Sequence, residues 1–122
     1  MRIGLISMGL CLALLMGCGS AENAVNLFTL QDDIALGEQV RAEIESDSSG
    51  MELLDSSAYS KIYGYLYSIR DSILNSGEVH YKTEFPWRIR IIKDDSTLNA
   101  FCAPGGYIYI YTGILKYLEA ED

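Results

Sequence analysis

The chain has 122 residues, enough for one small domain, and its 17 acidic and 9 basic residues give a net charge of −8. Nucleic acids and anionic membrane surfaces are bound through clustered Lys and Arg side chains, and the sequence has no such cluster. No nucleic-acid partner is therefore expected, and we interpret the acidity as a source of solubility at a cell envelope.

The N-terminus has the features of a secretion signal. Arg2 supplies a short positive region, residues 3–16 are uncharged, and Gly17 and Cys18 close the segment. An apolar stretch of this length is shorter than the roughly 20 residues that a membrane-spanning helix needs, and it matches the core of a signal peptide. Residues 1–17 are therefore predicted to be a signal peptide.

The end of this signal, Leu15-Met16-Gly17-Cys18, resembles a bacterial lipobox, which predicts that Cys18 is the lipid-modified first residue of the mature protein. Residues 18–28 would then be a lipidated tether that anchors a folded part over residues 29–122 to a membrane. A plain signal peptide, cleaved two or three residues later, is the alternative. We expect the bacterial cell envelope as the location. Gly19, rather than aspartate, indicates the outer membrane facing the periplasm in a Gram-negative cell.

Two amphipathic helices are predicted to follow the tether. The first covers about residues 31–46, and Thr29 and Asp32 have the spacing of a capping box at its start. The second covers about residues 55–77, with Asp55 or Ser56 as its cap. Apolar residues spaced three and four apart give each helix one apolar face. They are Ile34, Leu36, Val40 and Ile44 in the first, and Tyr59, Ile62, Tyr63, Leu66, Ile69 and Ile73 in the second.

A small antiparallel sheet is predicted next, which gives an α+β fold class. A strand over about 86–92 would place Trp87, Ile89 and Ile91 on one face and two arginines on the other. Residues 99–103 and 107–112 would form a β-hairpin, because the Pro-Gly-Gly between them favours a tight turn. In the second hairpin strand, tyrosines alternate with isoleucines, so one face is aromatic and the other aliphatic.

Few side chains offer chemistry of their own. His80, the single histidine, is interpreted as a solvated loop residue. Cys102 is interpreted as a small buried apolar residue, so a Cys–His catalytic pair is not expected. Asp94 and Asp95 are interpreted as a turn whose carboxylates cap backbone amides. These residues therefore suggest no catalytic group and no metal ligand in this chain.

Residues 99–115 carry a more specific pattern: Asn-Ala-Phe, then Pro-Gly-Gly, an alternating strand, and Gly-Ile-Leu. In order and spacing this segment resembles the strand–turn–strand before the active-site helix of metallopeptidase family 48, the HtpX-like and CAAX-prenyl-protease-like zinc endopeptidases. The resemblance covers about residues 32–118 and is specific from Trp87 onward. It implies a zincin-like (gluzincin-type) domain, a zinc cofactor and protein or peptide substrates, with a role in envelope protein quality control.

The H-E-x-x-H helix of that family requires two histidines one helical turn apart, and this chain has only one. We therefore expect the N-terminal part of a membrane-anchored zinc metalloendopeptidase, truncated before the zinc helix, inactive alone and binding no zinc itself. The competing interpretation is a complete small envelope lipoprotein that acts as a binding or assembly module without catalysis.

The resemblance also implies where a substrate would bind. Proteases of this kind commonly add the substrate backbone to a sheet edge beside the zinc helix, which assigns Asn99, Ala100 and Phe101 as the substrate strand. The strand over 107–112 is the alternative edge. With the zinc helix missing, we expect an exposed apolar patch on the aromatic or the aliphatic face of that strand.

Overall fold

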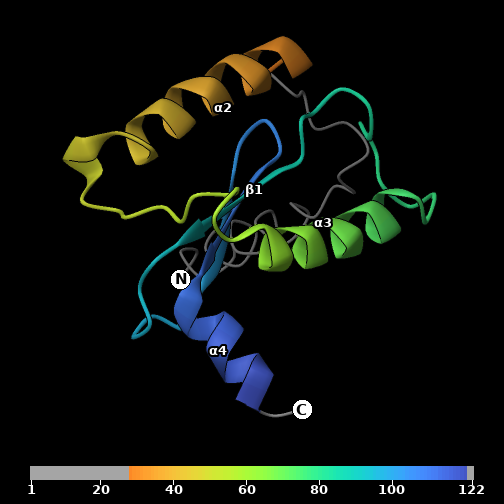
Figure 1. Cartoon of the computed structure of the whole chain (residues 1–122). Coiled ribbons are helices and arrows are strands. Elements are labelled where there is room, and N and C mark those ends of the chain that lie inside the picture. Colours follow the sequence, from red (N-terminus) through yellow and green to blue (C-terminus); the bar gives the residue numbers. More distant parts are fainter. Residues whose placement is uncertain (1–27, 121–122) are drawn as a thin grey trace, which may run out of the picture.

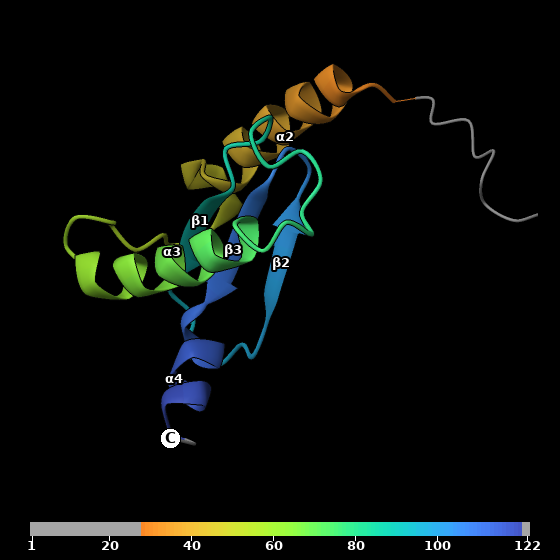
Figure 2. The same cartoon turned by 90° about the vertical axis from the view of Figure 1, so that its right-hand side faces the viewer.

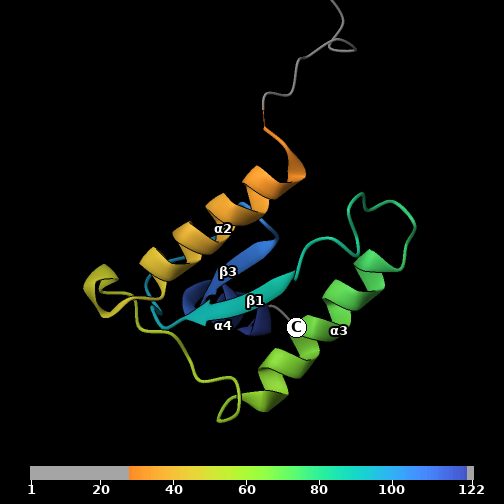
Figure 3. The same cartoon turned by 90° about the horizontal axis from the view of Figure 1, so that it is seen from above.

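In the computed structural model, which describes residues 28–120, two helices lie on opposite faces of a three-stranded sheet (Figure 1). Seen from above, α2, the sheet and α3 form three successive layers (Figure 3). This arrangement confirms the α+β fold class. The elements are α2 (Leu30–Ile44), η3 (Asp47–Ser49), α3 (Ser60–Leu74), β1 (Arg88–Ile92), β2 (Ala100–Ala103), β3 (Tyr107–Tyr111) and α4 (Thr112–Ala120).

The predicted capping box starts α2. Thr29 is the N-cap, its hydroxyl accepts the N–H of Asp32, and the Asp32 carboxylate accepts the N–H of Thr29 in return. The buried line of the helix differs from the expected one, because Leu36 is exposed and Gly37 is buried. The predicted Ile34, Val40 and Ile44 are partly buried, and Gly37 takes the buried place expected for Leu36, against the turn at Pro104 and Gly105.

Helix α3 begins at Ser60, about one turn later than predicted. Asp55 does cap the segment, since its carboxylate accepts the N–H groups of Ser57 and Ala58, but residues 56–59 form turns rather than helix. The predicted apolar face is divided along its length. Its N-terminal half is packed on the sheet, whereas Ile69 and Ile73 near the C-terminal end are exposed.

The strand order is β1-β3-β2, so β3 is central (Figure 2). The predicted hairpin is confirmed: β2 and β3 are antiparallel, and Gly105 and Gly106 in the turn between them both have positive φ. The prediction of a wholly antiparallel sheet was wrong, because β1 pairs with β3 in parallel and the sheet is mixed.

The connection between β1 and β2 explains this pairing. Residues 93–99 are held against the start of α4: the Asp94 carbonyl accepts the Gly113 N–H at 3.0 Å, and the Thr112 hydroxyl accepts the Asp94 N–H at 2.9 Å. The connection therefore passes the end of β3 and places β2 on its far side. A Cβ at Gly113 would overlap the backbone of Asp95 and Thr97, so the close contact requires glycine.

Each face of the sheet has its own core. The face toward α3 is aliphatic, and α3 contributes Tyr63 and Leu66, which pack on Ile89 and Ile91. The face toward α2 is aromatic, and Tyr107 and Tyr109 are almost fully buried there with Ile92 and Ala103. The expected exposed patch is therefore not on the aromatic face, because α2 covers it.

Candidate functional site

The outer edge of β2 is open. The Asn99 carbonyl accepts the Tyr111 N–H at 3.1 Å, which makes this a hydrogen-bonded pair of the antiparallel ladder. Because such pairs alternate, Phe101 and Ala103 also direct their backbone groups to β3, and Ala100 and Cys102 direct theirs outward. Among residues 28–120 no other strand pairs with this outward edge.

The open edge is short. The Ala100 N–H donates to the side-chain oxygen of Asn99 at 2.9 Å, and Pro104, just after the strand, has no N–H. The groups that remain available to another strand are the Ala100 carbonyl and the N–H and carbonyl of Cys102. The prediction that Cys102 is buried was wrong: it is exposed, because it lies on the edge strand beyond the cover of α3.

The outer edge of β1 is closed by side chains and by a short extended segment. The Ile91 N–H donates to the Tyr63 hydroxyl at 3.0 Å, and that hydroxyl donates to the Leu54 carbonyl at 2.9 Å. The Ile91 carbonyl accepts the Leu54 N–H, and the Ile89 carbonyl accepts the Tyr67 hydroxyl. Burial of the Tyr63 hydroxyl raises its pKa. This edge therefore has no backbone row free for a ligand strand.

Phe101 is the side chain of β2 that lies on the aromatic face. Its ring stacks on Tyr109 with centroids 5.0 Å apart and an interplanar angle of 15°, and it also contacts Tyr111. Phe101 is half-buried, so part of the ring remains accessible beside the open edge. Its position is fixed by the fully buried Tyr109 beneath it.

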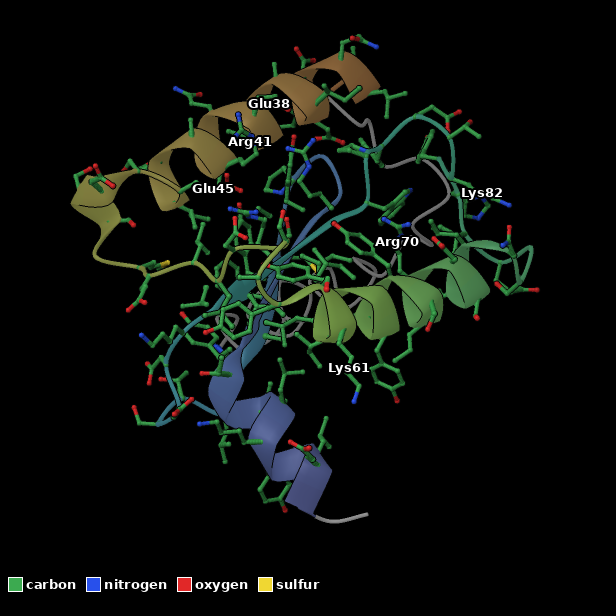
Figure 4. The ribbon with its side chains drawn as sticks, viewed as in Figure 1. Glu38, Arg41, Glu45, Lys61, Arg70 and Lys82 are labelled. Atoms are coloured by element: carbon green, nitrogen blue, oxygen red, sulfur yellow. The ribbon has the colours of Figure 1, made fainter. Side chains whose placement is uncertain are left out.

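A polar network fixes this aromatic face under α2, whose Glu38, Arg41 and Glu45 are labelled in Figure 4. The Tyr109 hydroxyl donates to Glu45 at 3.4 Å, and Arg41 lies 3.3 Å from the same carboxylate. Burial and then the Glu45 carboxylate raise the pKa of Tyr109 to about 12. The tyrosine therefore stays protonated as a donor at ordinary pH.

A second part of the network lies at the hairpin end of α2. The Tyr107 hydroxyl donates to Glu38, and together with Arg41 it lowers the pKa of the Glu38 carboxyl. A Cβ at Gly37 would lie 2.8 Å from the carbonyl carbon of Pro104 and would overlap the carbonyl oxygen. Helix α2 therefore rests directly on the backbone turn that ends β2.

The loop before β2 is held by the predicted aspartate turn. The Asp94 carboxylate accepts from the Ser96 hydroxyl at 2.6 Å, from the Thr97 hydroxyl at 2.6 Å and from the Ser96 N–H at 2.9 Å, and these bonds lower the pKa of Asp94. Asp95 accepts from Lys116 and from Thr112, which lowers its pKa in turn. Asp94 thus caps a backbone amide as predicted, whereas the Asp95 carboxylate bonds to side chains of α4 instead.

An apolar groove of about 260 Å³ runs between the C-terminal half of α3 and the aliphatic face of the sheet. Its lining includes Ile69 and Ile73 from α3, Ile108 and Ile110 from β3, and Trp87. The aliphatic alternative for the exposed patch is thus the one that the structure favours, because α3 lies over β1 and leaves the neighbouring strands partly uncovered.

No metal centre is formed by residues 28–120. His80 is exposed, in the loop that follows α3, and no three His, Cys, Asp or Glu side chains in this part of the chain come together as a ligand set. Nor does the described part contain a helix long and apolar enough to cross a membrane. Cys18, the predicted lipidation site, lies outside the described residues.

A family model described as Peptidase family M48 matches residues 61–122, half of the chain. This chain belongs to peptidase family M48. The match begins at the start of α3 and includes the whole sheet and α4, whereas α2 lies outside it. A comparison with curated proteins finds no match.

M48 peptidases are zinc-dependent and act on proteins. The residues that the structure describes do not fit a zinc ion, because they contain no cluster of suitable ligands. What this M48 chain contributes among its described residues is therefore the sheet, its open edge and the helices that fix that edge.

The structure places Ala100 and Phe101 on the edge strand β2, with Asn99 just before it, and β3 is central and has no open edge. The sequence interpretation missed the closing of the other edge by Tyr63 and Tyr67. A signal was present, since Tyr63 and Tyr67 are four residues apart on one side of the predicted helix, and tyrosine hydroxyls need hydrogen-bond partners when buried.

Proposed function

We propose that this chain forms the N-terminal part of a zinc metalloendopeptidase domain, and that the open edge of β2 holds the backbone of the protein substrate. The observation that carries the proposal is the free row of backbone groups at Ala100 and Cys102, in a chain of the M48 family. A peptide that adds to this row becomes a fourth strand and is fixed in the extended form that a protease cleaves.

The zinc-binding residues are assigned to sequence outside this chain. H-E-x-x-H needs two histidines, and the chain has only His80. The apolar groove supports the same assignment, because a further helix packed there would cover Ile108 and Ile110. The nucleotide sequence past the codon for Asp122 tests it. H-E-x-x-H in a downstream frame supports the assignment, and its absence favours a binding lipoprotein without catalysis.

The substrate edge can be tested at a single backbone N–H. Proline in place of Cys102 removes the outward N–H and leaves the ladder to β3 intact, because Phe101 and Ala103 carry the inward groups. Cys102→Ala is the matched control, since it removes the same thiol and keeps the N–H. Binding of a fluorescent extended peptide to the chain is measured by anisotropy, and unfolding of both variants is followed by circular dichroism.

We expect Cys102→Pro to weaken peptide binding by about tenfold, the effect of one backbone hydrogen bond together with the unpaired group that it leaves. Cys102→Ala should bind as the unchanged chain does, and both variants should unfold at similar temperatures. Equal binding by the two variants would show that the peptide does not use this edge.

We also propose that Cys18 carries a lipid anchor that holds the protein at the bacterial envelope, in the outer membrane facing the periplasm if the cell is Gram-negative. The support is the lipobox-like Leu15-Met16-Gly17-Cys18. In cells, Cys18→Ser should move the protein from the membrane fraction to the soluble fraction, whereas Cys102→Ser should leave it in place. Membrane attachment that survives Cys18→Ser would contradict the anchor.

A further inference from the structure

Beyond the backbone contacts, the β2 edge carries a side chain positioned to select among peptides. We infer that Phe101 is a specificity-determining residue, which favours a bulky apolar side chain, above all an aromatic one, at the peptide position beside it. This inference rests on the proposed substrate edge and adds the chemistry of the substrate to it.

The geometry of strand addition places a peptide side chain beside Phe101 in either direction. In an antiparallel addition, Cys102 forms the hydrogen-bonded pair, and the next peptide residue lies opposite Phe101 with its side chain on the aromatic face. In a parallel addition, one peptide residue bridges the Ala100 carbonyl and the Cys102 N–H and again lies opposite Phe101. The contact therefore does not depend on the direction of the peptide.

The Phe101 ring is accessible and held in position. It is half-buried, and it stacks on Tyr109 at 5.0 Å. Tyr109 is fully buried and its hydroxyl donates to Glu45 on α2. A peptide side chain on this face would extend the row of stacked rings by one member, a contact that aromatic and large aliphatic groups satisfy and that a carboxylate does not.

The opposite face of the same edge offers no comparable contact. Ala100 and Cys102 alternate with Phe101, and both are small and exposed. A peptide side chain on that face therefore meets little that would select it. The edge should accordingly select at one peptide residue, on the aromatic face only, which suits segments exposed by unfolded proteins rather than one fixed sequence.

A set of guest peptides tests this inference. The host is a fluorescein-labelled peptide of threonine, serine and glutamine with one central guest position, occupied by phenylalanine, leucine, alanine or aspartate. Dissociation constants are measured by anisotropy for the chain and for Phe101→Ala, Phe101→Leu and Tyr65→Ala. Tyr65 is the control because it is an exposed aromatic on α3, an element on the opposite side of the sheet.

We expect the phenylalanine peptide to bind about three- to tenfold more tightly than the alanine peptide. Phe101→Ala should abolish this preference, so that the phenylalanine and alanine peptides bind with equal affinity, and Tyr65→Ala should leave both the preference and the affinities unchanged. Phe101→Leu, which keeps the apolar volume, should retain a preference for leucine and lose most of the preference for phenylalanine.

The outcomes separate the two proposals. Peptides that all bind with equal affinity would leave the substrate edge in place and overturn the role of Phe101. A preference that survives in Phe101→Ala, with the chain folded by circular dichroism, would overturn it as well. If no peptide binds, the substrate edge itself is contradicted, and the specificity that rests on it is contradicted too.

Discussion

The two edges of the sheet differ in where their backbone groups find partners. On β1, the outward carbonyl of Ile89 and both outward groups of Ile91 are bonded to tyrosine hydroxyls from α3 or to the backbone of Leu54. On β2, the outward groups of Cys102 have no partner within residues 28–120. One edge is thus part of the folded core, and the other keeps backbone groups that no described strand pairs with.

This difference shows how a small sheet can keep an open edge without inviting uncontrolled pairing. A long, flat, apolar edge is an aggregation hazard, and proteins limit it by shortening the edge and by interrupting it with proline. Here the side chain of Asn99 accepts the Ala100 N–H, and Pro104 follows the strand. Only a short peptide segment can therefore pair with the outer edge of β2. A short edge favours a weak, exchangeable peptide over a second copy of the sheet.

Removing the support that α2 gives to the open edge should have the largest effect on stability. Gly37→Ala should lower the free energy of unfolding by about 3 kcal/mol, because the new Cβ overlaps the backbone of Pro104 and α2 must move off the hairpin. Gly64→Ala is the matched control on α3, where a Cβ meets nothing, and it should raise stability by about 0.5–1 kcal/mol. Urea unfolding of both variants measures the difference, and a stabilised Gly37→Ala would contradict the close packing.

Removing the hydrogen bonds that close the β1 edge should have the next largest effect on stability. Tyr63→Phe keeps the ring and removes the hydroxyl that pairs with both Ile91 and Leu54. Leaving these buried groups unpaired should cost about 2 kcal/mol of unfolding free energy. Tyr65→Phe, at an exposed position of the same helix, should change stability by less than about 0.5 kcal/mol. Equal effects of the two changes would show that the hydroxyl does not close the edge.

A third, smaller effect depends on pH and concerns the ring beneath Phe101. The pKa of Tyr109 is about 12 in the folded chain against 10.0 for an unperturbed tyrosine. Between these values the unfolded chain has lost the proton and the folded chain still holds it, so raising the pH favours unfolding. The stabilisation that Tyr109 gives through its raised pKa is fully present below about pH 10. About 1.4 kcal/mol of this stabilisation should be lost by about pH 11.

Tyr109→Phe isolates this contribution from those of other tyrosines. Between about pH 9 and 11 the unchanged chain should lose more stability than Tyr109→Phe does, by the amount given above. Urea unfolding at a series of pH values measures both slopes. Parallel slopes would mean that Tyr109 is not held as a buried donor to Glu45.

Features set by neighbouring residues could be predicted from the sequence. The capping box of Thr29 and Asp32 and the tight turn before Tyr107 both depend on residues within three or four positions, and both are present. The start of α3 was placed too early, because Asp55 caps a turn as readily as a helix. Local signals thus identified the elements better than their boundaries.

Features set by distant residues could not be predicted in the same way. The parallel pairing of β1 depends on two hydrogen bonds, from the Asp94 N–H to the Thr112 hydroxyl and from the Gly113 N–H to the Asp94 carbonyl, which no local sequence pattern predicts. The exposure of Cys102 follows from that topology, since the residue is on the surface only because β2 is the edge. The proposed assignment of residues 99–101 as the substrate strand came from the family resemblance. Only the structure shows that this strand lies at an edge of the sheet.

Amide hydrogen exchange, resolved by residue with NMR, tests the difference between the two edges most directly. In the free chain, the Ile91 N–H should exchange slowly because it is bonded to the Tyr63 hydroxyl, and the Cys102 N–H should exchange rapidly. An extended apolar peptide should slow exchange at Cys102 and leave Ile91 unchanged. A Cys102 amide that is already as protected as Ile91, or one that the peptide does not protect, would contradict the assignment of β2 as the binding edge.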